Sequence, residues 1–331
     1  MNKTQDFLEL QKMCQRSFPD RLDQHLAQIG KPAGERYLER SLQLSWREGR
    51  RPRVERLDLR RYADPWTWWR VDDEDKAARE WQMMRWLYGQ GLPVPRPYAG
   101  GDGFVLLARA PGQGHPAAEE SDGAWVLPHL DAFARLLARL HRLVPPAGVR
   151  DVLPAVALQE ALRRVEQLAA WCGESGLQEA VAELAGVEVE VCPLCVLRGE
   201  AIFIRAQCDA RGITALSTWD QSALGDPRWD VARAALWLRV HDAEAAAERF
   251  CDAYAGYGAA PVGDTSFWIA AAAAQGWALA SWVRVQKEQG ALAQEQLAAA
   301  EKVIGQREMW IEQTWRALTR FRYENTSVQV S

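Results

Sequence analysis

Hydrophobic and polar residues alternate along two neighbouring stretches of the chain, "YLERSLQLSW" at 37–46 and "RVERLDLRRY" at 53–62. The residues between them, "REGRRP", include the Gly and Pro that are typical of a tight turn. This pattern predicts a β-hairpin. The first 30 residues read instead as a helix, which we expect to be an N-terminal appendage.

After the hairpin, the period of the pattern changes to that of a helix. The segment "DEDKAAREWQMMRWLYGQG" at 73–91 has acids in its first turn and glycine near its end, as amphipathic helices often do. Its apolar positions at helical spacing are Ala77, Trp81, Met84 and Tyr88. The proline-rich "LPVPRPY" at 92–98 cannot continue this helix, and "GFVLLARAPG" at 103–112 then predicts a short strand.

The remainder of the chain is predicted to be mostly helical. Helical patterns occupy 130–143, 157–172, 176–186 and 267–283, and helices continue to about residue 322. Two short strand-like pieces, at 200–206 and 213–218, interrupt the helices. We therefore expect an α+β protein with a small β-rich lobe and a larger helical lobe. The expected parts are a helical appendage at 1–34, a β-rich N-lobe at 35–112, a helical C-lobe at 113–322 and a tail at 323–331.

The composition is that of an ordinary globular protein: of 331 residues, 48% are hydrophobic and 25% are charged. The net charge of −4 argues against bulk electrostatic attraction to nucleic acid. The most apolar helix, at 267–283, contains Gln275 and Gly276, so we expect a buried helix and no membrane span. Acids and amides near the N-terminus stand where a signal peptide needs an apolar run, so we expect a cytoplasmic protein.

The six cysteines are expected to be mostly reduced in that compartment. Cys192 and Cys195 form a CxxC, which can be half of a zinc site or a redox pair, but only Cys208 lies near enough to add a ligand. We favour the interpretation that these two cysteines are small apolar residues on a strand.

The segment "SALGDPRWDVARAALWL" at 222–238 carries the most specific signal. It is a turn that leads into a helix, with Asp226 placed as the N-cap and Pro227 at the first helical position. Together with "LDLRRY", "LLARAPG" and "LARLHRL", which precede it in the same order, it resembles the aminoglycoside phosphotransferase and choline kinase family. The resemblance covers the chain from about Glu35 to residue 290 and implies the two-lobed protein-kinase-like fold. Asp226 and Asp230 keep the family pattern, which implies that they brace the catalytic loop and cap the helix.

The family signature also contains a catalytic loop of the form HGDxxxxN and a strand that ends in DWE. HGD falls on Arg198, Gly199 and Glu200, and the metal-binding Asn falls on Arg205.

The register of the second motif is set by the intact Gly-Asp-Pro at 225–227. DWE therefore falls on Thr218, Trp219 and Asp220. The segments that differ from the family are the ones that the resemblance places at phosphate and magnesium.

Phosphoryl transfer needs Mg²⁺ on hard oxygen ligands, a carboxylate beside the substrate hydroxyl, and cations on the phosphates. Glu200 keeps a carboxylate but moves it by one methylene. Arg205 replaces a neutral oxygen ligand with a fixed cation, and Thr218 replaces the main metal carboxylate with a hydroxyl. We therefore expect a pseudokinase, in which phosphotransfer is weak or lost and Mg²⁺ is not bound.

The alternative is an active ATP-dependent small-molecule kinase. In that hypothesis Glu200 is the base, and Asp220, on the same side of its strand as Thr218, holds the metal with Glu200. Arg205 then contacts a phosphate directly. The substrate would be a hydroxyl compound such as a sugar, an amino alcohol or an aminoglycoside.

The resemblance also implies residues on the nucleotide side, where ATP is the expected ligand. Arg60 matches the basic residue that contacts the phosphates, and Glu80 matches its partner on a helix; the other interpretation is an ordinary surface ion pair. The adenine is expected at main-chain groups from Leu107 to Ala110. His141 matches a family Leu-His pair at a helix end, where we expect a structural role. Whether a nucleotide binds without metal is left open.

Two surfaces are candidates for a ligand or a protein partner. The phosphate-cradling loop is expected between the first two strands, where the sequence has a single glycine, Gly49, and several arginines. These arginines either bind an anion or belong to a solvated hairpin; they are Arg47, Arg50, Arg51, Arg53 and Arg56. Three of the 16 tryptophans are clustered in the sequence, Trp66, Trp68 and Trp69. Such a cluster either stacks on a partner or packs in a core.

Overall fold

The computed structural model describes residues 11–12, 14–33, 38–48, 50–62, 76–101, 103–110, 113–114, 124–258, 265–292 and 297–328. The tryptophan cluster at 66–69 lies outside these residues. The chain divides into two compact units. The first comprises Met1–Gly114, Ala147–Val152 and Ala206–Asp220, and the second comprises His115–Pro146, Leu153–Arg205 and Gln221–Ser331. Two segments from within the expected helical lobe therefore belong to the first unit.

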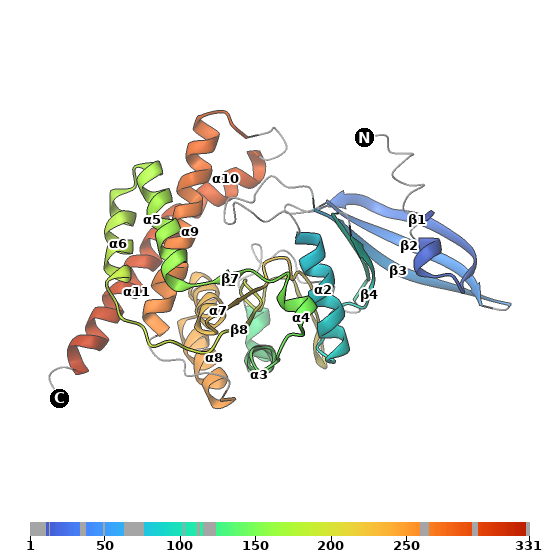
Figure 1. Ribbon diagram of the computed structural model, residues 1–331, viewed down its shortest axis with the longest axis horizontal. Coiled ribbons are helices and arrows are strands. Elements are labelled where there is room, and N and C mark those ends of the chain that lie inside the picture. The colour runs from blue at the N-terminus through green and yellow to red at the C-terminus, as the bar shows by residue number, and fades with distance from the viewer. Residues whose placement is uncertain are drawn as a thin grey trace. The chain divides into compact units, whose positions relative to one another are not determined.

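A five-stranded antiparallel sheet is the main element of the first unit (Figure 1). Its strands are β1 (Leu22–Ala33), β2 (Leu38–Glu48), β3 (Arg51–Arg61), β4 (Pro97–Gly101) and β5 (Phe104–Ala108), in the order β1-β2-β3-β5-β4. The expected hairpin is confirmed, since β2 and β3 pair from the turn to Leu38↔Arg61. Alternation along β2 places Leu42 and Leu44 on one face, where both are fully buried.

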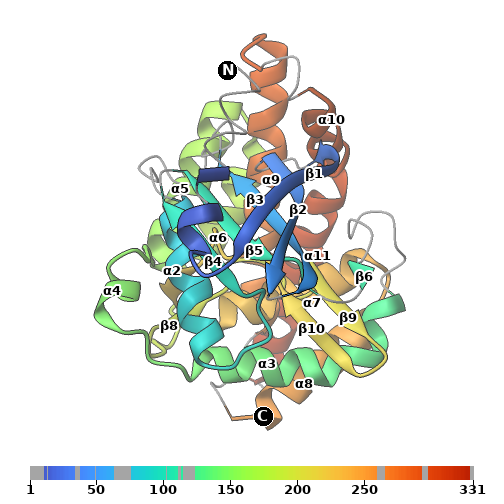
Figure 2. The ribbon, with the colours of Figure 1, turned by 90° about the vertical axis from the view of Figure 1, so that its right-hand side faces the viewer.

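The helix expected over the first 30 residues is wrong for Leu22–Ala33, which is strand β1. In the described part of the chain before β1, residues 11–12 and 14–17 are helical, and this short stretch lies over one face of the sheet (Figure 2). Cys14 and Phe18 pack there in one hydrophobic cluster with Leu26 of β1. Pairing with the edge of β2 supplies main-chain hydrogen bonds that local sequence preference does not report. Residues 14–33 are therefore part of the sheet unit, and the helical appendage expected at 1–34 is wrong over this range.

A second, smaller sheet in the same unit has the order β10-β9-β6. Its strands are β6 (Gln113–Gly114), β9 (Ala206–Asp209) and β10 (Gly212–Leu216). The strand-like piece expected at 213–218 overlaps β10. The piece expected at 200–206 is wrong except for its last residue, because residues 202–205 form turns.

Helix α2 (Lys76–Gly89) confirms the helix expected after the hairpin, and α4 (Ala147–Arg150) is packed against it. Of the expected apolar positions of α2, Ala77 and Met84 are buried, but Tyr88 is 47% exposed. The charged residues Arg79 and Glu80 are buried as well, which apolar spacing does not predict, because they have polar partners elsewhere in the unit.

The second unit is mostly helical. Its helices are η2 (Ala124–His129), α3 (Leu130–His141), α5 (Leu158–Cys172), α6 (Ser175–Ala185), α7 (Arg228–Val240), α8 (Glu244–Gly256), α9 (Thr265–Glu288), α10 (Leu297–Gly305) and α11 (Arg307–Val328). A three-stranded sheet joins them, with the order β7 (Ala155–Val156), β11 (Ala223–Gly225), β8 (Cys195–Leu197). The α+β class expected from the sequence is confirmed.

Helix α9 is the central helix of this unit and packs against α5, α6, α7, α10 and α11 (Figure 1). Its alanine-rich run is buried, as expected for residues 267–283. Among the described residues, no helix is long and apolar enough to cross a membrane. The loose tail expected at 323–331 is wrong for residues 323–328, because α11 continues through them.

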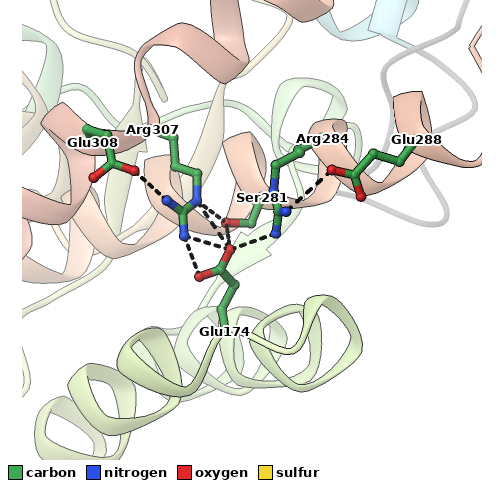
Figure 3. Close-up of polar contacts among 6 residues, drawn as sticks. All are labelled: Glu174, Ser281, Arg284, Glu288, Arg307 and Glu308. Atoms are coloured by element: carbon green, nitrogen blue, oxygen red, sulfur yellow. Dashed lines mark hydrogen bonds and ion pairs between the residues drawn. The ribbon is translucent and has the colours of Figure 1, made fainter.

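A carboxylate at the start of α6 ties together three of these helices (Figure 3). Glu174 Oε2 lies 2.6 Å from Arg307 Nη2, and Oε1 accepts hydrogen bonds from Ser281 Oγ at 2.8 Å and from Arg284 Nη2 at 3.2 Å. Ser281 and Arg284 belong to α9, and Arg307 begins α11. Burial raises the pKa of Glu174, but the hydrogen bonds from Arg307 and Ser281 outweigh it and hold the pKa below its ordinary value.

Candidate functional site

In the second unit, residues 198–205 follow β8 and occupy the position of the expected catalytic loop. Arg198 is fully buried, and its guanidinium donates to the carbonyls of Ala201 and Ile204, each at 2.6 Å. These bonds close the loop into a tight turn. Glu200 lies within that turn and is only 7% exposed.

Asp230 of α7 holds the main chain of this loop. Its Oδ2 accepts the N–H of Arg198 at 2.6 Å, and its Oδ1 accepts the N–H of Gly199 at 3.0 Å. Gly199 has φ +84°, and a Cβ there would lie 2.0 Å from the carbonyl oxygen of Gln221. The glycine is therefore required by the backbone whether or not the loop performs chemistry.

Asp226 and His141 complete the support around Asp230. Helix α7 begins at Arg228 with Pro227 as its N-cap, one residue later than expected, but Asp226 Oδ1 accepts the N–H of Arg228 at 2.9 Å and so still caps this end. His141, the last residue of α3, lies 3.3 Å from Asp230 Oδ2 through Nε2 and 2.7 Å from the Tyr254 hydroxyl through Nδ1. Burial raises the pKa of Tyr254, which keeps its hydroxyl neutral. These contacts are those of a structural brace.

The middle of the loop packs into the interior of the second unit. Ala201, Ile202 and Phe203 are each at most 5% exposed. The rings that surround Phe203 have centroids 5.0 to 5.4 Å from it and belong to Phe133, Trp237 and Phe250. At the end of the loop, Arg205 is exposed and has a φ of +53°.

In the first unit, Arg60 of β3 and Glu80 of α2 form an ion pair with Nη1 2.6 Å from Oε1. The side chains are 4% and 0% exposed, which excludes the interpretation of an ordinary surface pair. Burial raises the pKa of Glu80 to about 7; Arg60 opposes this shift and the charge of Asp220 adds to it. Arg60, Glu80 and Asp220 therefore lie in one electrostatic neighbourhood.

The segment at the DWE position is buried in the same unit. Thr218 is 2% exposed, has φ +80°, and donates its hydroxyl to the carbonyl of Ser217. Trp219 is fully buried and donates its Nε1–H to the carbonyl of Leu216 at 3.1 Å. Asp220 is 2% exposed.

Arg79 is a residue of this site that the sequence reasoning missed. Its Nη1 donates to the main-chain carbonyl of Asp220 at 2.7 Å, and its Nε donates to that of Val152 at 3.1 Å. It thereby fixes α2 to two segments from much later in the chain. The one available signal is helical spacing, since Arg79 stands four residues before the buried Met83.

The arginine-rich turn lies apart from the Arg60–Glu80 pair. Arg51 starts β3 and Arg60 is nine residues further along, which is about 30 Å of strand. The five arginines of the turn are exposed, and Arg53 pairs with Glu48 at 2.7 Å.

The arginine-rich turn does not join the first two strands, where the phosphate loop was expected. The first two strands are β1 and β2, so their connection is 34–37, outside the described residues. The arginine-rich turn instead joins the second strand to the third. This correction follows from β1, which sequence preference did not predict.

Possible metal ligands are few. Among the described residues, no group of three or more His, Cys, Asp or Glu side chains is arranged to hold a metal ion. Cys192 and Cys195 are buried free thiols, and only Cys195 lies on a strand, β8. Burial raises the pKa of both thiols, which disfavours the thiolate that binds metal.

The chain is similar to known phosphotransferases. The family model described as "Phosphotransferase enzyme family" matches residues 46–196. No curated protein matches the chain by sequence.

The solved structures that share its fold include three kinases or phosphotransferases of known source or ligand. The ethanolamine kinase of Plasmodium vivax is 10% identical, with a TM-score of 0.62 and coverage of 93% of this chain and 89% of that one. The macrolide 2′-phosphotransferase of Brachybacterium faecium is 19% identical, with a TM-score of 0.58 and coverage of 87% and 96%. A spectinomycin phosphotransferase in complex with ADP and spectinomycin is 11% identical, with a TM-score of 0.57 and coverage of 92% and 98%. These matches confirm the resemblance inferred from the sequence motifs.

Proposed function

Because the chain has the fold and the matching sequence segment of the aminoglycoside phosphotransferase and choline kinase family, we propose that it is a pseudokinase of that type. In this proposal it binds a nucleotide, a small molecule or a protein partner, and transfers phosphate weakly or not at all. The observation that carries the proposal is Thr218, which is buried at the position where the family has its main metal carboxylate. A hydroxyl that already donates to the carbonyl of Ser217 is a poor ligand for Mg²⁺.

The loop of the second unit supports the same proposal. Arg205 places a permanent cation where the family has a neutral oxygen ligand, so it opposes a divalent ion there. Arg198 and Phe203 hold the loop as a packed turn, which is an arrangement for stability more than for an open substrate site. The residues at these positions do not fit Mg²⁺, and no reaction step is assigned to that ion.

The nucleotide side of the first unit has kept more of its chemistry. Arg60 is a buried guanidinium held by Glu80, and a guanidinium binds phosphate well. The relatives of this fold include a phosphotransferase with bound ADP. A nucleotide is therefore one of the ligands that the proposal includes.

The second candidate is an active small-molecule kinase that phosphorylates a hydroxyl on a sugar, an amino alcohol or an aminoglycoside. It is favoured by the presence of two buried carboxylates, Glu200 as the base and Asp220 as the metal ligand. We further expect a cytoplasmic location and no nucleic-acid partner, in keeping with the net charge of −4.

Turnover distinguishes the two candidates. The protein is incubated with ATP, Mg²⁺ and a panel of hydroxyl acceptors, and ADP release is measured for the wild type, Glu200→Ala and Glu188→Ala. Glu188 is exposed and serves as the matched control. We expect no acceptor-dependent ADP release from any of the three. Release that Glu200→Ala abolishes and Glu188→Ala preserves would establish the kinase instead.

A further inference from the structure

The five-stranded sheet carries charged residues at two successive inward positions of β3. Asp58 and Arg60 are two residues apart on one strand, so they lie on the same face of the sheet. Both are buried, with 8% and 4% of their surface exposed. Arg60 is held by Glu80, but Asp58 has different partners.

Arg109, which follows the neighbouring strand β5, forms an ion pair with Asp58. Its Nη2 lies 2.8 Å from Asp58 Oδ1, and its Nε lies 3.2 Å from Oδ1 and 3.4 Å from Oδ2. The main-chain N–H of Arg109 donates to the carbonyl of Arg56 at 2.8 Å, which fixes the start of this side chain. The guanidinium therefore lies across the strand face with little freedom to move.

Ser41 of β2 extends the cluster to a third strand. It stands directly opposite Asp58 in the β2–β3 register. Its hydroxyl lies 3.3 Å from Asp58 Oδ1, and Arg109 Nη2 also donates to it. Ser41, Asp58 and Arg109 thus form one hydrogen-bonded group across β2, β3 and the end of β5.

The register places this group where a nucleotide base would have to lie. Asp58 pairs with Leu107, and Arg60 pairs with Val105. The family resemblance puts the phosphates at Arg60 and the base at the main chain from Leu107 to Ala110. A base that reaches those main-chain groups must therefore cover Asp58.

A purine ring is an uncharged plate that binds best against apolar surface. The Asp58 and Arg109 side chains are 12% and 38% exposed, so the ion pair retains contact with water that a base would remove. Removing that water without a new partner is unfavourable for both charges. The cluster is therefore an unfavourable surface for a purine base to pack against.

We propose that the Ser41–Asp58–Arg109 cluster closes this face of the sheet to purine nucleotides. The inference rests on the proposed function and refines it, because it leaves ligands without a purine, or a protein partner, as the molecules that the chain binds. A purely structural role explains the cluster less well. A partly exposed ion pair contributes little to stability, so the sheet does not depend on it.

The test is a gain of binding. The double variant Asp58→Ala/Arg109→Ala removes the ion pair and leaves small apolar side chains on the face. The matched control, Glu48→Ala/Arg53→Ala, removes an exposed ion pair of 2.7 Å from the turn of the same sheet. Binding of ATP and ADP, without Mg²⁺, is measured by calorimetry and by the shift of the melting temperature for all three proteins.

We expect the Asp58→Ala/Arg109→Ala variant to bind ATP at least tenfold more tightly than the wild type, with the control unchanged. Equal affinity in the wild type and the double variant would overturn the proposal, whether both bind or neither does. If the double variant does not fold, Asp58→Asn/Arg109→Gln is used, since it removes both charges and keeps polar side chains of similar size at both positions. The same tenfold gain is then expected, and its absence counts against the proposal.

ADP release separates this inference from the proposed function. A wild type that binds ATP without releasing ADP contradicts the exclusion of purines and leaves the pseudokinase proposal standing. A wild type that releases ADP in a Glu200-dependent reaction contradicts the pseudokinase proposal itself.

Discussion

Arg60 and Glu80 are joined by an ion pair that is closed to solvent, with 2.6 Å between Nη1 and Oε1. Removing either residue takes a direct ion pair away from the other at a buried position, which costs more than removing a surface pair. In the proposed function, this pair is the part of the nucleotide side that is kept, and Thr218 is the position where the metal carboxylate is absent.

The pH dependence of stability reports on Glu80. Its pKa is raised from 4.5 to about 7, mainly by burial, so the folded protein keeps a proton that the unfolded chain releases. The contribution of Glu80 to the free energy of unfolding therefore falls as the pH rises from about 4.5 to about 7, and it is constant above that. Whatever Glu80→Gln costs at pH 4.5, we expect the stability of this variant to rise relative to that of the wild type by on the order of 3 kcal/mol as the pH rises from 4.5 to 8. Urea unfolding at a series of pH values measures this difference.

Glu48→Gln is the control for that experiment, because Glu48 is exposed and should show no such gain. A Glu80→Gln curve that runs parallel to the wild type at all pH values would contradict the buried, raised pKa.

Replacing Phe203 tests whether the loop at 198–205 is a packed turn. We expect Phe203→Ala to lower the free energy of unfolding by about 3–5 kcal/mol, because it leaves a cavity among Phe133, Trp237 and Phe250. Phe203→Leu, which fills most of that space, should cost clearly less. A loop that is open to a substrate would show little effect from either change in chemical denaturation.

Acid sensitivity is expected from Glu174. Its pKa is held below its ordinary 4.5, so its ion pairs stabilise the fold above about pH 4.5 and are lost as the pH falls through the lower, folded value. We expect Glu174→Gln to cost about 1–3 kcal/mol at pH 7 and to approach the wild type at the acid end. Thermal unfolding followed by circular dichroism measures the stability of both proteins at pH 7 and at acid pH.

The neighbouring Glu308 provides the matched control for Glu174. It lies 2.5 Å from Arg307, but its side chain is 83% exposed. Glu308→Gln should change stability by less than about 0.5 kcal/mol, and an equal loss in both variants would show that burial is not the cause.

Restoring the carboxylate at position 218 should create metal binding. We expect the Thr218→Asp variant to bind Mn²⁺ with a sub-millimolar dissociation constant, measured by electron paramagnetic resonance, whereas the wild type does not bind it. Asp supplies the oxygen ligands that hard divalent ions prefer. The control Thr214→Asp makes the same change at a nearby position outside the motif. Mn²⁺ binding by the wild type with similar affinity would refute the loss of the metal site.

The helices and the β2–β3 hairpin could be predicted because their patterns are local. The Gly-Asp-Pro at 225–227 likewise predicted the capping contact of Asp226, since the cap and the capped residue are two positions apart. Strand β1 was missed because its stability comes from pairing with β2 and from the packing of Leu26 against Cys14 and Phe18. The end of α11 was missed because "YENTSV" is polar and carries no helical stripe.

By itself, the sequence determined the class of the fold and the order of the motifs, and the resemblance proposed Glu200, Arg205 and Thr218 as the residues at the family's metal and catalytic positions. The tertiary structure decided which charged residues are buried and what holds them. Arg79 meets the carbonyl of Asp220 across 141 positions, and Asp58 meets Arg109 across 51. A periodic pattern reports which side of an element faces inward, but a buried charge is stable only with a partner, and that partner is chosen by folding.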